Sequence, residues 1–160
     1  MANAVSIEVE GLEQLRLALR TLPEKVQSKI LGAATAKAAL PIRNAARAAS
    51  PMKTGRLRRN IRSTRGKRNG SEASAFVSVR KLNAKAVAKF KRTTGKKATA
   101  NPNDAFYWRH HEFGTAKMRA RPFLRPAFEQ QKFAAVQVLK EALDRGIQTE
   151  AAKAGGLKAT

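Results

Sequence analysis

Apolar residues recur along the chain at two spacings, one typical of strands and one of helices. Val5, Ile7 and Val9 alternate with polar residues, which predicts a half-buried strand over residues 5–9. Leucines then recur at helical spacing over residues 12–21 and predict a helix. The first predicted elements are therefore a short strand and a helix.

The longest predicted element is an alanine-rich helix. It begins after Pro23, a residue suited to a first turn, and its apolar residues recur every three or four positions as far as Ala49. Pro41 lies inside it and is expected to kink it near residues 37–40, because proline has no N–H for the preceding turn. Ser50-Pro51 ends it. Its small side chains favour close packing against another helix or a sheet.

A basic hairpin is predicted after this helix. A turn at residues 52–55 leads into one amphipathic helical turn at residues 56–61. A polar, basic strand follows at residues 61–68, and Asn69-Gly70 is a strong tight-turn signal. The alternating residues 72–80 predict the return strand.

Residues 81–103 interrupt this regular pattern. They are rich in lysine and predict a long, mobile, basic loop that contains a helical piece at residues 83–90. A short helix is expected next, capped by Asp104 or by the asparagine before it and ended by Gly114-Thr115.

Aromatic residues concentrate between Asp104 and Phe128, which hold six of the chain's nine. Phe106, Trp108 and Phe113 are expected to share one helical face and to anchor the short helix in the core. The segment is therefore predicted to be the hub of the fold.

A last helix is predicted from Pro126 to about residue 145, ended near Gly146. Residues 147–160 have little to bury and predict a flexible tail. The predicted fold is α+β, with one domain over residues 1–146. In it, a small antiparallel sheet packs against the alanine-rich helix and the C-terminal helix.

Composition narrows the class of protein without changing this fold. A chain of 160 residues with 42% apolar residues can bury one modest core. The absence of cysteine excludes disulfides and thiolate metal sites, and no apolar run approaches the length of a membrane span. The N-terminal residues lack the pattern of a secretory signal. We therefore expect a cytosolic product with no membrane partner.

The net charge of +22 predicts an anionic partner. Thirteen basic residues and no acid lie between Glu24 and Glu72, and eight more with no acid lie between Glu72 and Asp104. The positive charge is therefore concentrated in the middle of the chain. The basic run from Arg43 to Arg68 and the loop after it are candidates for contact with DNA phosphates or with an acidic protein partner. The named candidates are Arg56, Arg58, Arg59, Lys85, Lys89, Lys91, Arg92, Lys96 and Lys97.

Catalytic and metal-binding patterns are not found. His110, His111 and Glu112 are adjacent, which places them about 100° apart on a helix, so they do not converge on one metal ion. No set of nucleophile, base and orienting group is favoured by spacing, and no glycine-rich nucleotide motif or phosphate-binding lysine motif occurs. We expect no enzyme activity, no cofactor, no metal and no small-molecule ligand.

Three segments together resemble the tail-completion, or head-tail joining, proteins of long-tailed bacteriophages, the group that includes minor tail protein Z of lambdoid phages. The first is the long helix ending in Ala49-Ser50-Pro51, followed by Thr54-Gly55-Arg56-Leu57 and Ile61. The second is Phe106-Tyr107-Trp108 followed by His111-Glu112-Phe113-Gly114-Thr115. The third is Ala120-Arg121-Pro122-Phe123-Leu124-Arg125-Pro126-Ala127-Phe128. Their order and spacing agree over roughly residues 5–145, although the basic insertion between Arg80 and Asp104 departs from the usual pattern.

This resemblance implies a virion protein of the neck, made in the host cytoplasm and assembled as a ring, with a hexamer as the expected form. Genome DNA would pass through the lumen without sequence reading, and neighbouring neck and tail-tube or tail-terminator proteins would be partners. A surface for other subunits is expected at Glu112, Phe113, Gly114, Thr115, Arg121, Pro122, Phe123, Leu124 and Arg125. Glu112 is expected to pair with an arginine such as Arg121 or Arg125, within or across subunits.

Two other functions remain open from the sequence. One is a basic nucleic-acid-binding protein of ribosomal or nucleoid type, which the charge alone would favour. The other is a nuclease or another enzyme, which would need a metal-binding cluster that the sequence does not offer. A ring that survives high salt would favour the neck protein, whereas a monomer that binds only nucleic acid, and loses it steeply with salt, would favour the first alternative.

Overall fold

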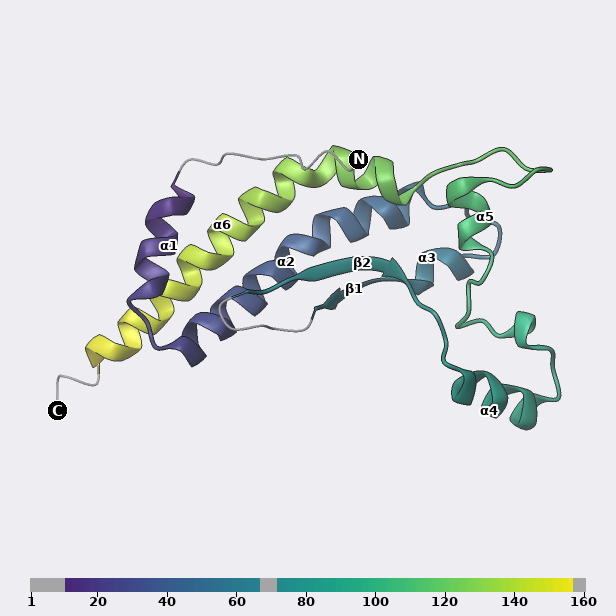
Figure 1. Ribbon diagram of the computed structural model, residues 1–160, viewed down its shortest axis with the longest axis horizontal. Coiled ribbons are helices and arrows are strands. Elements are labelled where there is room, and N and C mark those ends of the chain that lie inside the picture. Colours follow the sequence, from purple (N-terminus) through teal and green to yellow (C-terminus); the bar gives the residue numbers. More distant parts are fainter. Residues whose placement is uncertain (1–10, 67–71, 157–160) are drawn as a thin grey trace.

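The computed structural model describes residues 11–66 and 72–156 (Figure 1). The helices are α1 (Leu12–Arg20), α2 (Glu24–Ala49), α3 (Arg56–Asn60), α4 (Ala84–Thr94), α5 (Trp108–Phe113) and α6 (Leu124–Gly156), with a 3-10 turn η1 at Ala98–Ala100. The strands are β1 (Ile61–Arg65) and β2 (Ala75–Val79). The predicted strand at residues 5–9 and the Asn69-Gly70 turn lie outside the described residues.

The body of the protein is an antiparallel pair of long helices, α2 and α6, packed along their lengths (Figure 1). Small residues on α2 allow the close approach, since Gly32, Ala34 and Ala46 are all buried. α2 continues through Pro41 without ending there, so the predicted alanine-rich helix is confirmed, while its kink stays a prediction.

The C-terminal helix is longer than predicted, because α6 continues to Gly156. Gly146 does not end it; a Cβ added there would lie 2.7 Å from Ile30 Cγ2 on α2. Gly146 therefore lies where the two long helices approach each other closely. Ile147 packs against the same apolar cluster as Ile30, which explains why the chain beyond residue 146 is helical and the tail predicted from residue 147 is wrong as far as residue 156.

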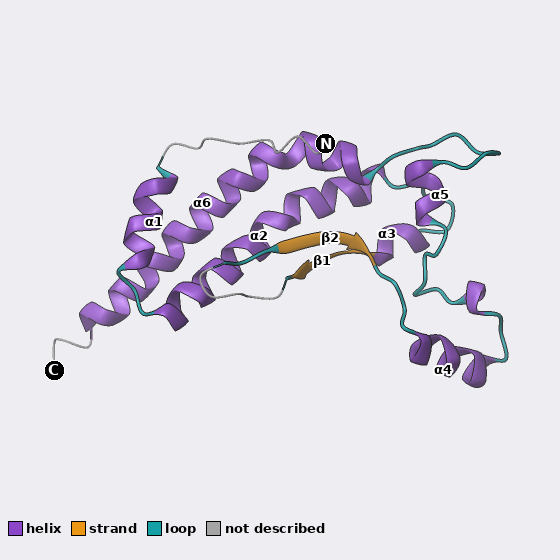
Figure 2. Ribbon diagram, in the orientation of Figure 1, coloured by secondary structure: helices purple, strands orange, loops and turns teal. Residues whose placement is uncertain are grey.

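The sheet is an antiparallel hairpin laid on α2, with Ile61 opposite Val79 and Arg65 opposite Ala75. Ile61 and Val79 are buried together with α2 and with the residues around the start of α6. The members of this core cluster are Ala46, Leu57, Ile61, Val79, Ala105, Phe123 and Ala127. The predicted α+β class, with a small antiparallel sheet on a long helix and a C-terminal helix, is confirmed (Figure 2).

A second apolar cluster holds the other end of the helix pair. Leu19 of α1 is buried there with Ile30 and Ala34 of α2 and Leu143 of α6. α1 thus closes the end of the molecule that lies opposite α3 and α5 (Figure 1).

The segment between β2 and α5 is partly helical. The helical piece predicted at residues 83–90 is confirmed and extends to Thr94, and the side chain of Asn83 caps it by accepting a 2.7 Å hydrogen bond from the Ala86 N–H. The predicted cap by Asp104 is wrong, because α5 begins only at Trp108 and Asp104 instead closes a turn by donating its N–H to the Asn101 carbonyl.

Candidate functional site

The carboxylate of Glu112 closes the start of α6. Its Oε2 accepts hydrogen bonds from the backbone N–H groups of Phe123 (2.9 Å) and Leu124 (3.0 Å), and its Oε1 accepts one from Arg125 (3.2 Å). The first four N–H groups of a helix, counted from the capping position, lack partners within the helix. The capping position here is Phe123, so the fourth is Pro126, which has no N–H. The Glu112 carboxylate therefore accepts a hydrogen bond from each of the three N–H groups at this helix start that have no partner within the helix.

Glu112 is almost fully buried, at 5% exposure, at the positive end of the α6 dipole. The expected ion pair with the side chain of Arg121 or Arg125 within the subunit is wrong, because both carboxylate oxygens bind backbone N–H groups. The guanidinium of Arg125 lies instead over the ring of Phe113, 5.1 Å from its centroid. An arginine pair with Glu112 across subunits stays a prediction.

The chain between α5 and α6 is a braced loop. Gly114 ends α5 with a φ of +74° and donates its N–H to the His110 carbonyl, which confirms the predicted helix end. The Arg121 N–H donates to the His111 carbonyl at 2.7 Å. A Cβ at Gly114 would lie 2.9 Å from the Ala120 nitrogen, so only glycine suits both the backbone conformation and the space.

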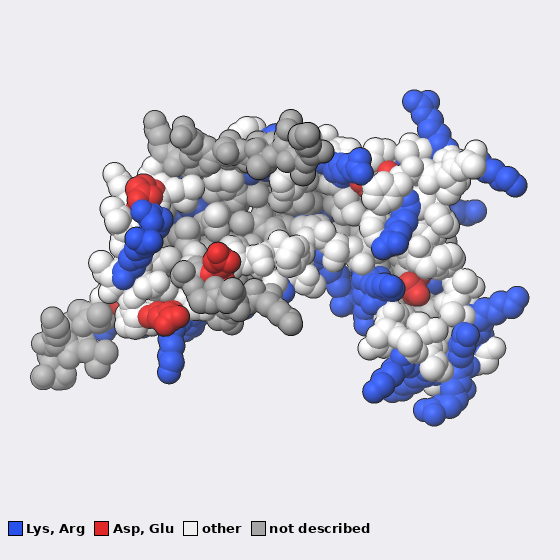
Figure 3. Space-filling model, in the orientation of Figure 1, with Lys and Arg blue, Asp and Glu red and all other residues white. Residues whose placement is uncertain are grey.

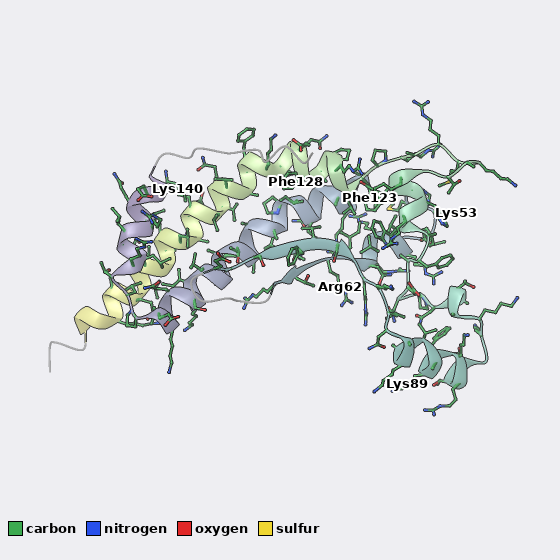
Figure 4. The ribbon with its side chains drawn as sticks, in the orientation of Figure 1. Lys53, Arg62, Lys89, Phe123, Phe128 and Lys140 are labelled. Atoms are coloured by element: carbon green, nitrogen blue, oxygen red, sulfur yellow. The ribbon has the colours of Figure 1, made fainter. Side chains whose placement is uncertain are left out.

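The residues predicted at the subunit interface divide between surface and interior. Phe123 is wrong as a surface contact, because its side chain is fully buried in the core against α2 and the hairpin (Figure 4). Glu112 is buried as the helix cap, and Gly114 and Leu124 are half-buried. The side chains left on the surface are Phe113, Thr115, Arg121, Pro122 and Arg125.

The aromatic anchors of α5 also differ from the prediction. Phe106 is 48% exposed and Phe113 is 58% exposed, so neither anchors the helix in the core. The helical-face argument fails for Phe106 because it precedes the helix. Trp108 does pack against the core, and Tyr107 does so beside it.

Five arginines gather where the end of α2 meets α3 and β1, and we call Arg43, Arg47, Arg58, Arg59 and Arg62 the arginine cluster. Arg47 is held in place because its Nε donates a 3.0 Å hydrogen bond to the Ile61 carbonyl. The side chains of Arg47, Arg58 and Arg59 line a hollow of about 420 Å³. Burial lowers the pKa of the Arg47 guanidinium, and the charges of Arg43, Arg58 and Arg62 lower it further. The charged groups that shift Arg47 are all arginines, so an anion bound there would relieve their repulsion.

Sequence reasoning named Arg58 and Arg59 of this cluster but placed Arg43, Arg47 and Arg62 only within a basic run. The available signal was the four-residue spacing of Arg43 and Arg47, which puts both on one face of α2. Their approach to Arg62 depends on how the hairpin packs on α2, and no local pattern encodes that.

The remaining predicted DNA contacts lie on an arm that projects from the body. α4 and η1 contact each other and stand apart from the helix pair (Figure 1). The arm is strongly basic, and Figure 3 shows Lys and Arg side chains gathered at this end of the molecule. Its exposed cations are Lys85, Lys89, Lys91, Arg92, Lys96 and Lys97.

Arg56 differs from the other predicted contacts, because it ties the arm to the body. Its Nη1 donates a 2.8 Å hydrogen bond to the Thr99 carbonyl, and the Asn60 side chain donates to the Pro102 carbonyl nearby. The Nε and Nη2 of Arg56 are buried, so little of its guanidinium is open to an outside phosphate.

The amino-acid sequence matches the model of a known protein family. The sequence model of the family described as "Bacteriophage HK97-gp10, putative tail-component" matches residues 13–114, which is more than half of the chain. The chain belongs to this family. No curated protein and no solved structure gave a significant match.

Membership in the HK97-gp10-like family makes the protein a phage tail component and places it in the virion. The matched region includes α2, the hairpin, the basic arm and the end of α5 at Gly114, but it stops before the residues that Glu112 caps. Among the described residues of this HK97-gp10-like protein, no helix is long and apolar enough to cross a membrane. Within the same residues, no group of three histidine or acidic side chains could hold a metal ion.

Proposed function

We propose that this HK97-gp10-like protein is a structural component of the phage neck that completes the tail and joins it to the head. It acts as a homo-oligomeric ring, with a hexamer as the expected form, and genome DNA passes through its lumen. Its other partners are the neighbouring neck proteins and the tail-tube or tail-terminator proteins. The proposed function is that of the tail-completion proteins, the group that includes minor tail protein Z.

The arginine cluster carries this proposal. Three of its guanidinium groups line one hollow, and the charged groups that act on Arg47 are all arginines, while Arg56 of the adjacent α3 binds the basic arm. Such a surface attracts DNA phosphates without contacting the bases. This suits the lumen of a ring through which DNA of any sequence must pass. We place the cluster on the lumen wall of the ring.

The surface above Glu112 supports a role in assembly. Phe113 is 58% exposed and stacks with the exposed Arg125, and aromatic and arginine side chains are the types enriched at subunit interfaces. The braced loop and the cap by Glu112 hold both side chains in fixed positions. We therefore assign Phe113, Arg125 and the neighbouring Thr115, Arg121 and Pro122 to contacts with other subunits.

Size-exclusion chromatography with light scattering tests the assembly. The protein should elute as one defined ring both at low salt and at about 1 M salt, where the Debye length falls to roughly 3 Å. A matched pair of variants makes the test specific: Phe113→Ser should reduce the ring fraction, whereas Phe133→Ser, at an exposed phenylalanine of α6 outside the assigned surface, should leave it unchanged. A salt-independent monomer at high protein concentration, alone and with tail proteins, would contradict the proposal.

The arginine cluster also favours a second function, a basic nucleic-acid-binding protein of ribosomal or nucleoid type. In that case the protein would be a monomer whose binding to DNA or RNA falls steeply with salt. The same experiment, repeated with nucleic acid, separates the two functions. A ring without nucleic acid supports the neck protein, and assembly that appears only on nucleic acid supports the alternative.

A further inference from the structure

An apolar groove of about 860 Å³ runs between β2, α2 and α6. Ala38 and Ile42 of α2 and Val136 of α6 form its floor, and residues 73–77 form one wall. The opposite rim is on α6, where Phe128 remains 49% exposed (Figure 4). The groove thus leaves a long apolar surface uncovered by the described residues.

On the β2 side of the groove, the backbone edge of the strand faces the groove. Residues 73–77 line the groove, and three of them, Ala75, Phe76 and Val77, are consecutive residues of β2, although successive side chains of a strand point to opposite faces of the sheet. A groove that contacts three consecutive strand residues follows the backbone edge of the strand. The sheet has the order β1-β2 in the described chain, so the edge of β2 away from β1 is the one at the groove.

The hydrogen-bond pattern identifies which backbone groups face the groove. On the β1 side, Gly66 donates its N–H to the Ser74 carbonyl and Arg80 donates its N–H to the Asn60 carbonyl. Because bonded pairs alternate in an antiparallel ladder, every second residue of β2 directs its N–H and C=O away from β1. The residues that do so within β2 are Ala75, Val77 and Val79.

We propose that residues 5–9 of the same chain occupy this groove as a third strand, antiparallel to β2. Val5, Ile7 and Val9 alternate with polar residues, which is the pattern of a strand with one buried face. Added at the edge of β2, this segment would bind the backbone groups of Ala75 and Val77 and turn its apolar side chains to the groove floor. The inference does not depend on ring assembly.

The position of Gly11 supports this occupant. A Cβ at Gly11 would lie 3.1 Å from Lys140 Nζ on α6, and the adjacent Leu139 both lines the groove and packs in the cluster around α1 (Figure 4). The segment therefore leaves α1 at one end of the groove. Ten extended residues span roughly 33 Å, whereas α6 from Lys140 back to Arg125 covers about 22 Å, so the groove is within reach.

Direction and charge agree with this placement. β2 points from the α1 end of the molecule toward α3, so a segment that ends at Gly11 would run antiparallel to it (Figure 1). Residues 1–10 carry two acids and no base in a chain of net charge +22. The α6 side of the groove carries the cations Arg125 and Lys132 with one acid, Glu129, which pairs with Lys132 at 2.7 Å. The short tether to Gly11 favours the chain's own segment over that of a neighbouring copy, because it raises the local concentration.

Amide hydrogen exchange resolved to single residues tests the proposal on the full chain. Ala75 and Val77 should exchange slowly although β1 does not bond them, and Ile7→Asp should make both exchange at least about tenfold faster. Ser6→Asp, the same change at a polar position of the segment, is the matched control and should leave both amides protected. Amides of α2 report in each variant that the rest of the fold is intact.

Three results would overturn the inference. The first is unprotected exchange of Ala75 and Val77 in the unaltered chain. The second is protection that Ile7→Asp does not change, which would mean that something else covers the edge. The third is protection that Ile7→Asp removes but that rises with protein concentration, which would mean that a second copy supplies the segment.

Discussion

Glu112 Oε2 lies 2.9 Å from the backbone nitrogen of Phe123, eleven residues further along the chain, and accepts its hydrogen bond in a buried site. Together with the hydrogen bonds from Leu124 and Arg125, this contact joins α5 to the start of α6. It braces the loop between Phe113 and Arg125, and the Phe123 side chain beside it lies in the core.

Replacing Glu112 with alanine should destabilise the protein by about 2–4 kcal/mol, because three N–H groups at a helix start lose their acceptor. Glu129→Ala is the control, since that exposed glutamate only pairs with Lys132 on the surface of α6 and should cost less than about 1 kcal/mol. Urea unfolding measures both. Equal small losses in the two variants would contradict the capping role.

Gly146→Ala should also destabilise the fold, by about 1–3 kcal/mol, through its contact with Ile30. Helix propensity alone would predict a gain of about 1 kcal/mol for the same change, so the sign of the effect decides between the two. The double variant Gly146→Ala with Ile30→Ala should lose less than the sum of the single losses. A stabilised Gly146→Ala variant would show that α2 and α6 are not in contact there.

Gly114→Ala should cost more than Gly95→Ala, although both glycines have a positive φ. At Gly95 an added Cβ meets nothing within 4 Å, so only backbone strain of about 1 kcal/mol is expected. At Gly114 the Cβ also meets the Ala120 nitrogen at 2.9 Å, and the braced loop must shift. Thermal unfolding of the two variants gives the comparison, and equal shifts in Tm would argue against the tight loop.

Charge removal in the arginine cluster should weaken DNA binding without changing sequence preference. For Arg58→Ala with Arg59→Ala, the slope of log K against log salt should fall by about 2, since each phosphate contact contributes about 0.9. Arg20→Ala with Lys25→Ala removes the same charge at the α1 end and serves as the control. Fluorescence anisotropy with two unrelated duplexes measures both slopes; the same slope for both variants would contradict a local DNA contact.

The sequence predicted those parts of the fold that local pattern encodes. The spacing of alanines along α2, the proline before it and the alternation of β2 are each decided within a few residues, and the structure confirms them. The end of α6 was predicted wrongly because Gly146 is a helix breaker by local rules, and only its contact with Ile30 explains a glycine there.

The candidate site was less accessible to sequence reasoning because its contacts join distant residues. Glu112 was expected at a subunit interface with an arginine partner, whereas it is buried in the subunit and backbone N–H groups at the start of α6 bind it. Phe123 belongs to the segment that the family resemblance assigned to a subunit surface, whereas its side chain lies in the core. The convergence of Arg47 with Arg62 required the packing of the hairpin on α2.

A cryo-EM reconstruction of the virion neck tests the central claim most directly. The claim predicts a closed ring of this chain at the junction of head and tail, with Arg47, Arg58 and Arg59 facing the DNA in the lumen. A neck map without this chain, or a ring whose arginine cluster lies on the outer wall, would contradict it.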